Sequence, residues 1–235
     1  MLKKIFNYFG YTFSKSKKST NIYEIIKLRL ESNPTDILLD VGANHGNFSK
    51  NLINYFNQLH LFEPNYELSK FLDKEFKQNK VKILNFGLGD TNEKILLNLT
   101  NDTGKTLSSI KNQTNELKNN FKNTEIIKKL EIQIKRLDQY LETLNIIDEK
   151  IFLKIDTQGN DFETLIGLGK YISNINFLKI EMPCIKLYKT NYDHWDIFAY
   201  LKQYKFEPVF FEHNYRKKNG QLIEYDCFFE KKVFN

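Results

Sequence analysis

A loop with two glycines joins a short apolar segment to a predicted helix at residues 40–49, which read Asp-Val-Gly-Ala-Asn-His-Gly-Asn-Phe-Ser. Gly42 and Gly46 allow a sharp turn and leave room for a ligand to approach the backbone. The helix expected to begin near Asn47 offers free N–H groups and the positive end of its dipole, which suit a carboxylate. Asp40 is placed to accept hydrogen bonds from an ammonium group. The loop therefore predicts a site for a ligand with an amino-acid head.

An acidic residue on the next predicted strand adds to this site. Glu63 lies 21 residues after Gly42, and a carboxylate at about that separation can accept hydrogen bonds from both ribose hydroxyls. A dinucleotide site needs Gly-x-Gly-x-x-Gly, but Asn44 and Asn47 stand where the second and third glycines would fall. The pattern favours S-adenosylmethionine, with a plain tight turn as the alternative. The cofactor contacts predicted in the loop are Asp40, Gly42, Ala43, Asn44, Gly46, Asn47 and Phe48.

Apolar strands and helices alternate along most of the chain. This alternation predicts a Rossmann-like α/β fold, with a mostly parallel central sheet and helices on both faces. A turn at Lys218-Asn219-Gly220 predicts a final hairpin and hence an antiparallel closing strand. Residues 100–125 are polar and are expected to form an insertion or mobile loop. The expected strands are 37–41, 59–63, 81–86, 94–99, 132–134, 151–156, 177–181, 207–211 and 222–229, and the expected helices are 22–31, 47–55, 65–78, 137–144, 161–168 and 195–204.

Six segments of the chain resemble, in order, the FkbM-type methyltransferase family. The resemblance covers roughly residues 36–232, and its specific parts lie at residues 40–46 and 154–159. It implies a class I methyltransferase fold over residues 36–235, preceded by a basic, helical extension over residues 1–35. The six segments are LLDVGANHGNFSK, LFEPN, NFGLGD, RLDQYL, LKIDTQGNDFETLIG and YDCFFEK.

The resemblance also implies roles for single residues. Members of the family depend on S-adenosylmethionine, and many are thought to methylate hydroxyls of sugars or polyketides. The loop from Gly42 to Gly46 is then expected to hold the methionine part of the cofactor, and Glu63, with Pro64 beside it, the ribose. The residues expected near the adenine are Leu88, Gly89 and Asp90.

The second specific segment departs from the family pattern. Asp156 is expected to border both the cofactor and the reacting centre. The family often has Glu where this chain has Gln158, followed by an acid in place of Asn160. An amide keeps the hydrogen bonding of the carboxylate but loses its charge, which argues against an acid or base role at residue 158.

Methyl transfer to an alcohol needs a base that takes the hydroxyl proton as the new bond forms. The candidates are Asp156 and Glu181, which end neighbouring predicted strands, and His194 at a predicted helix start, with Asp161 a weaker one. Each has a structural alternative: Asp156 can cap a helix, Glu181 can pair with a lysine, and a lone histidine is often structural. Two hard ligands are too few for a metal site, so no metal is predicted.

Charge and cysteine content bear on partners and location. The net charge is +6, and residues 1–20 carry +5 of it, which leaves +1 for the other 215 residues. The near-neutral charge of residues 21–235 argues against nucleic acid as a partner. Residues 1–20 combine lysines with apolar residues at helical spacing, so a weak contact with the inner membrane face and a solvated tail both fit. Two cysteines and no apolar run of about 20 residues favour a cytoplasmic protein.

Three functions remain open at this stage. The first is O-methylation of a hydroxyl on a sugar, a glycan or a small metabolite. The second is N-methylation of an amine from the same donor site, and the third is a non-catalytic scaffold that binds the cofactor. A nicotinamide oxidoreductase comes last because the glycine spacing fails. The expected partner is a small-molecule or glycan acceptor, and the sequence predicts no oligomeric state.

Overall fold

A seven-stranded sheet forms the centre of the molecule in the computed structural model, which describes residues 21–144, 146 and 148–232. The strand order is β3-β2-β1-β7-β8-β10-β9. Its pairs are parallel except that β10 runs antiparallel to both β8 and β9. The predicted fold class and antiparallel closing strand are thus confirmed. The strands are β1 (Ile37–Val41), β2 (Gln58–Phe62), β3 (Val81–Leu84), β7 (Ile151–Ile155), β8 (Ile175–Pro183), β9 (Phe206–Arg216) and β10 (Leu222–Lys231).

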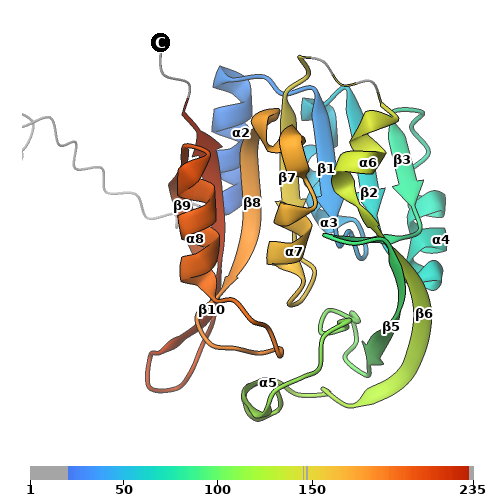
Figure 1. Cartoon of the computed structure of the whole chain (residues 1–235), viewed down its shortest axis with the longest axis vertical. Coiled ribbons are helices and arrows are strands. Elements are labelled where there is room, and N and C mark those ends of the chain that lie inside the picture. The colour runs from blue at the N-terminus through green and yellow to red at the C-terminus, as the bar shows by residue number, and fades with distance from the viewer. Residues whose placement is uncertain (1–20, 145, 147, 233–235) are drawn as a thin grey trace, which may run out of the picture.

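Helices cover both faces of this sheet, as Figure 1 shows. On one face, α2 (Ile22–Ser32), α3 (Asn47–Leu52) and α4 (Tyr66–Glu75) bury apolar side chains against the sheet. On the other face lie α6 (Leu137–Glu142), α7 (Asp161–Ile166) and α8 (His194–Gln203). Two 3-10 turns, η1 (Ile53–Tyr55) and η2 (Gly169–Ser173), follow α3 and α7. Each face of the sheet therefore has its own apolar core.

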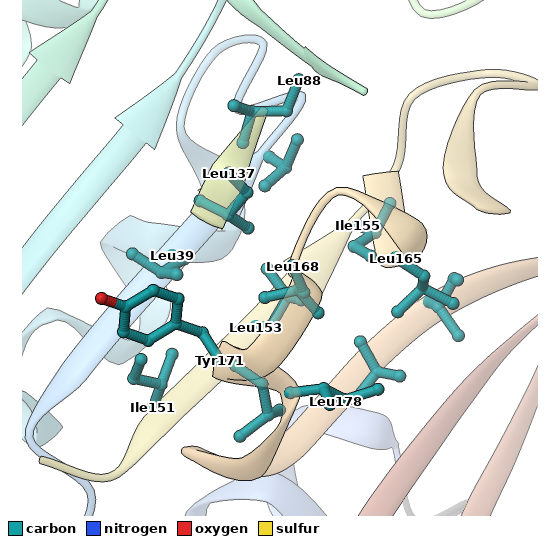
Figure 2. Packing of buried hydrophobic residues seen from close by; sticks show 14 of the residues in the cluster. Leu39, Leu88, Leu137, Ile151, Leu153, Ile155, Leu165, Leu168, Tyr171 and Leu178 are labelled. Atoms are coloured by element: carbon teal, nitrogen blue, oxygen red, sulfur yellow. The ribbon is translucent and has the colours of Figure 1, made fainter. Parts of the chain in front are cut away.

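The inner strands are apolar on both sides because both sides are covered. In β1 and β7 all residues are buried, and Leu39, Leu153 and Ile155 are completely so. Figure 2 shows these side chains packed against Leu165 and Leu168 from the α7 region. Burying one such side chain stabilises the fold by roughly 1.5–3 kcal/mol, so these strands form a rigid base for the residues at their carboxyl ends.

Helix α2 lies within the predicted extension of residues 1–35 and packs into the core of the domain. Its buried residues Ile22, Ile26 and Leu30 belong to the same cluster as residues of β1 and β7. Asn21 caps the helix by accepting the N–H of Glu24 at 3.0 Å. The basic amphipathic helix predicted within residues 1–20 lies outside the described residues. No helix in the described ranges is long and apolar enough to span a bilayer.

A second, three-stranded sheet of order β4-β6-β5 lies beyond the carboxyl ends of the central strands (Figure 1). Its strands are β4 (Gly87–Gly89), β5 (Glu93–Thr100) and β6 (Ile126–Arg136). The strand predicted at 132–134 is part of the longer β6, which has 11 residues, and β4 was not predicted. Between β5 and β6, the polar segment 100–125 contains helix α5 (Asn115–Asn120), which Thr114 caps.

Candidate active site

A cleft of about 590 Å³ opens at the carboxyl ends of the central strands, under the polar segment between β5 and β6. One wall consists of the predicted glycine loop, with Gly42, Asn44 and Asn47, and the other of acidic residues after β7 and on β8 and β10. Thr106 and Leu107 of the polar segment close one side. The sequence therefore located the cleft correctly, at the sheet edge where open α/β folds bind ligands.

The glycine loop has the backbone geometry that its sequence predicts. Gly42 has φ of +72°, and a Cβ atom there would lie 1.9 Å from the carbonyl oxygen of Asp156. Gly46 also has φ of +72°, and it packs on Leu72 and Phe76 behind the loop. The N–H groups of Gly42 and Ala43 both donate to the carbonyl of Phe62 at 3.0 Å. Only glycine fits at residue 42, because the backbone of Asp156, directly after β7, passes too close to leave room for a Cβ atom.

Glu63 lies immediately after β2 and faces the cleft. Its two carboxylate oxygens accept the backbone N–H groups of Asn44 and Asn65, each at 2.9 Å. A carboxylate has about four acceptor positions, so each oxygen keeps one free for a ligand. Burial raises the pKa of Glu63 to about 7, against the opposing effect of these two hydrogen bonds. The position suits two hydroxyl donors, because they would favour the charged form.

Asp40 lies behind the wall of the cleft instead of in it. Its side chain is completely buried, accepts a hydrogen bond from Ser49 at 2.7 Å, and lies 3.1 Å from the ammonium of Lys154. That ammonium also donates to the carbonyl of Gly42 at 2.7 Å. Asp40 thus acts on the glycine loop through Lys154, and the structure shows no exposed carboxylate oxygen for a ligand ammonium.

The residues predicted to lie near the adenine separate into two groups. Leu88 lines the cleft together with Gly87, whereas Gly89 and Asp90 lie outside its lining. Asn160 and Thr164 donate to the carbonyl of Leu88 at 2.9 and 3.1 Å, which fixes this short strand. Asn160, which replaces an acid of the family pattern, therefore has a structural contact at the edge of the cleft.

Two of the three predicted catalytic residues meet at the acidic end of the cleft. The side-chain amide of Gln158 donates to Asp156 at 2.9 Å and to Glu181 at 3.0 Å. The amide oxygen of Gln158 accepts the hydroxyl of Tyr188 at 2.9 Å. An amide can donate to two carboxylates at once, which a glutamate in its place could not do. The departure from the family pattern thus links two acids of the site.

The two linked acids have different proton affinities. Burial acts to raise the pKa of Asp156, but the charges of Lys154 and Lys179 and the bond from Gln158 hold it below its ordinary value. Burial raises the pKa of Glu181 well above its ordinary value, and the neighbouring charge of Glu224 adds to this. A carboxylate with a raised pKa is the stronger base, so Glu181 suits proton uptake better than Asp156.

His194 occupies a different environment from these acids. It is the first residue of α8, and its Nδ1 lies 3.0 Å from the carbonyl oxygen of Pro183. Its ring lies against Trp195 and Tyr225, and it is not part of the cleft lining. Asp161, the weaker candidate, bonds to the N–H groups of Thr157 and Gly159. Both residues have structural contacts that account for their positions.

Several residues of the cleft were not predicted. Lys179 forms an ion pair with Asp226 at 2.5 Å, and Glu224 lies beside Glu181. Tyr23 of α2 also lines the cleft. The alternation of charged and apolar residues along β8 and β10 was the available signal, since residues two apart share one face of a strand.

Comparison with known proteins decides the family. The family profile described as Methyltransferase FkbM domain matches residues 40–208. The chain belongs to the FkbM methyltransferase family. A search of curated proteins found no match. Methyltransferase FkbM from Methylobacillus flagellatus KT is 14% identical with a TM-score of 0.51, and the match covers 84% of this chain and 44% of that one. SMU.1697c of Streptococcus mutans, in complex with S-adenosylhomocysteine (SAH), is 10% identical with a TM-score of 0.50, over 92% and 100%.

At these identities the two structures show the class I methyltransferase fold. Family membership and fold together confirm the predicted enzyme class, a methyltransferase, and its cofactor, S-adenosylmethionine. The cleft of this FkbM methyltransferase fits that cofactor: Glu63 keeps two acceptor positions facing the cleft, and Gly42 presents bare backbone beside it. The residues that would hold the cofactor are Gly42, Ala43, Asn44, Glu63, Pro64 and Leu88.

The acidic end of the cleft was also considered as a metal site. The described part of this FkbM methyltransferase contains no group of three or more histidine, cysteine or acidic side chains arranged to hold a metal ion. Lys154 and Lys179 lie on the same face of the sheet as Asp156 and Glu181. Their ammonium groups form ion pairs with Asp40 and Asp226, respectively. The acids of the site are therefore organised by lysines and by Gln158.

Proposed function

We propose that this FkbM methyltransferase transfers a methyl group to a hydroxyl of a sugar, a glycan or a small metabolite. The observation that carries the proposal is Glu181, a carboxyl group with a raised pKa that lines the cofactor cleft and is bridged to Asp156 by Gln158. An alcohol needs such a base, because its proton must leave as the new bond forms. For an acceptor that has no proton to lose, alignment of the acceptor atom with the methyl donor would be enough, and no base would be needed.

S-adenosylmethionine, when bound, supplies a methyl group that is already activated by its positive sulfur. The chain holds the acceptor at the acidic end of the cleft, orients its hydroxyl oxygen towards the donor, and takes up the proton at Glu181. Asp156 keeps its negative charge beside Lys154 and is suited to accept a hydrogen bond from a second acceptor hydroxyl. Thr106 and Leu107 of the polar segment help to keep water from the reacting atoms.

The charge of the cleft supports a neutral acceptor. Three acids of the cleft lining take part in no ion pair within the described ranges. They are Glu181 on β8, Glu212 on β9 and Glu224 on β10. Such a surface repels the phosphates of nucleic acids. It would also hold an amine in its protonated form, which has no free electron pair for the methyl group. For these reasons we rank N-methylation second and exclude nucleic acid from the proposal.

A cytoplasmic location is part of the same proposal. Cys184 and Cys227 are both free thiols, which suits a reducing compartment. Weak contact of residues 1–20 with a membrane surface rests on their sequence, which combines lysines with apolar residues at helical spacing. Liposome binding by the whole chain, compared with a variant lacking residues 1–20, tests that contact, and equal binding would remove it from the proposal.

Labelled methyl transfer tests the main proposal. The purified chain is incubated with methyl-labelled S-adenosylmethionine and a panel of neutral mono- and disaccharides, and in parallel with amino sugars. We expect label in an O-methyl product, and Glu181→Gln should lower the rate about 100-fold or more, the usual contribution of a general base. Glu131→Gln is the matched control, because Glu131 is exposed on β6. Label found only in N-methyl products would reject the proposal, and SAH binding without any transfer would favour a scaffold.

A further inference from the structure

Glu224 faces the same cleft as Glu181 but was not predicted from the sequence. The two residues lie on the adjacent antiparallel strands β10 and β8, where Glu181 is paired with Asp226 and Glu224 with Pro183. Residues two apart on a strand share a face, so Glu181 and Glu224 are diagonal neighbours on one face of the sheet. Both side chains line the cleft and also line, with Tyr188, a smaller pocket beside it.

In the part of the chain that the structure describes, neither glutamate takes part in an ion pair. The two lysines nearest in the sheet are engaged elsewhere: Lys154 with Asp40 at 3.1 Å and Asp156 at 3.8 Å, and Lys179 with Asp226 at 2.5 Å. Glu224 is only 6% exposed, so water screens a second negative charge beside it weakly. Two carboxyl groups that share one site do not both ionise readily, because their like charges repel each other. The arrangement therefore implies that the pair retains one proton.

The other groups around the pair favour the same state. Burial raises the pKa of Glu224 to about 8, with further contributions from Asp156, from Asp226 on the same strand and from Asp161. Burial raises the pKa of the hydroxyls of Tyr188 and Tyr215, and both glutamates add to this, so these two side chains stay neutral beside the pair. The titratable and charged groups around the pair are Lys154, Asp156, Asp161, Lys179, Cys184, Lys186, Tyr188, Tyr192, Tyr215 and Asp226.

We propose that Glu224 is a positioning residue for methyl transfer, which shares one proton with Glu181 so that the pair presents a single negative charge to a neutral, polyhydroxylated acceptor. This inference rests on the proposed function. In the reaction, the acceptor oxygen forms a bond to the methyl carbon and the electrons of the sulfur–methyl bond return to sulfur. The hydroxyl proton passes to Glu181. The pair then carries two protons and no charge, and it loses one to water when the product leaves.

A proton shared by two carboxyl groups can be observed without an acceptor. Infrared difference spectroscopy follows the carbonyl stretch of protonated carboxyl groups during a pH titration of the whole chain saturated with SAH. We expect the wild-type protein to keep one such signal above pH 7. In Glu224→Gln, the amide can donate to Glu181 and the second charge is gone, so the signal should be lost at a pH at least one unit lower, a tenfold change in proton affinity.

Matched variants keep this test decisive. Glu224→Asp retains a carboxyl group and should retain the high-pH signal, and the exposed Glu131→Gln should titrate like the wild type. SAH affinity within threefold of the wild type shows that the Glu224→Gln cleft is intact. If that variant does not fold, Glu181→Gln removes the same signal from the other side of the pair. An unchanged titration in the folded Glu224→Gln or Glu181→Gln variant would overturn the inference.

Kinetics separate this inference from the proposed function. With any acceptor that the labelled assay identifies, Glu224→Gln should alter the high-pH side of the kcat profile, where the wild-type pair loses its shared proton, and leave KM for S-adenosylmethionine unchanged. If hydroxylated acceptors are methylated and the high-pH side of the profile does not change, the role of Glu224 is rejected while the proposed function stands. If the shared proton is observed and no hydroxyl is methylated, the proposed function is rejected instead.

Discussion

The carboxylate of Glu63 accepts the backbone N–H of Asn44 at 2.9 Å, which ties the end of β2 to the glycine loop that follows β1. The other carboxylate oxygen accepts the N–H of Asn65 at the start of α4. One buried acid thus fixes two loops and still faces the cleft. Cofactor binding and loop geometry are therefore coupled through Glu63, and its state of ionisation should affect both.

Cofactor affinity should depend on pH through Glu63. Burial raises the pKa of Glu63 without ligand to about 7, and the charged form is the one that we expect to accept the ribose hydroxyls. As the pH falls below about 7, Glu63 takes up a proton and loses acceptor capacity, so SAH should bind more weakly, approaching a tenfold loss per pH unit. Calorimetric titration between pH 5.5 and 8.5 measures this.

The variant Glu63→Gln serves as the control for that experiment. Its side chain does not ionise, so its SAH affinity should be low and nearly independent of pH. We expect a loss of at least tenfold relative to the wild type at pH 8, the cost of one hydrogen bond to a charged group. A variant that binds SAH as tightly as the wild type would contradict the assignment of Glu63 to the ribose.

Gly42→Ala should damage the loop far more than an equivalent change elsewhere. Its Cβ atom would lie 1.9 Å from the carbonyl oxygen of Asp156. Gly220 provides a matched control, because its φ is +88° and a Cβ atom there meets nothing within 4 Å. Both substitutions carry the strain of alanine at positive φ, about 1–2 kcal/mol. Only Gly42→Ala adds a backbone clash, of about 1–3 kcal/mol or more. Urea unfolding and SAH binding of both variants check this, and equal unfolding free energies would contradict it.

Lys154→Met should destabilise the protein strongly, because it leaves Asp40 charged, unpaired and completely buried. Breaking a buried ion pair in this way costs about 3–5 kcal/mol. Lys94→Met is the control, since Lys94 and Glu131 are 73% and 65% exposed and form a surface pair. That change should cost less than about 1 kcal/mol. The double variant Asp40→Asn with Lys154→Met should recover part of the loss in chemical unfolding. No recovery would mean that Lys154 acts mainly through the carbonyl of Gly42.

Stability should fall in mild acid because of His60 on β2. Burial, with some help from the charge of Lys82, lowers the pKa of His60 to about 4. Between pH 6.5 and 4 the unfolded chain therefore binds a proton at His60 that the folded protein does not, so the free energy of unfolding decreases as the pH falls. A shift of this size corresponds to about 3 kcal/mol.

The contribution of His60 can be isolated with His60→Gln, which retains a partner for the hydroxyl of Tyr140, 3.0 Å from the histidine ring. The difference in unfolding free energy between wild type and variant should shrink as the pH falls from 7 to 4. Urea unfolding at several pH values measures it. A difference that is constant over this range would show that His60 does not titrate as predicted.

The sequence predicted the central sheet closely because its strands are continuous apolar runs. Residues 37–41 form β1 as predicted, and the glycine loop lies at the expected edge. The second sheet was harder to predict. In β6 most side chains are exposed, lysines among them, and only every second residue near its end is buried. That pattern differs little from a polar loop until its partners β4 and β5 are known.

Some residues of the candidate site could be predicted from the sequence, and others could not. Glu63 and Asp156 were predictable because each directly follows an apolar strand, where a charged side chain reaches the ligand edge of the sheet. Asp40 also lies on such a strand, but its side chain is buried under the helices and forms an ion pair with Lys154. Glu224 depends on the register between β8 and β10. Register joins residues distant in the chain, and a single sequence does not specify it.

Strand β10 lies between β8 and β9, although it is the last strand of the sheet to leave the ribosome. A nascent chain that stops before Leu222 lacks the strand that joins β8 to β9 in the sheet, and Lys179 lacks its ion-pair partner Asp226. The strand that fills this gap also delivers Glu224 to the cleft. Translation must therefore reach the final strand before the fold closes, and a prematurely terminated product would lack part of the reaction centre as well as a structural strand.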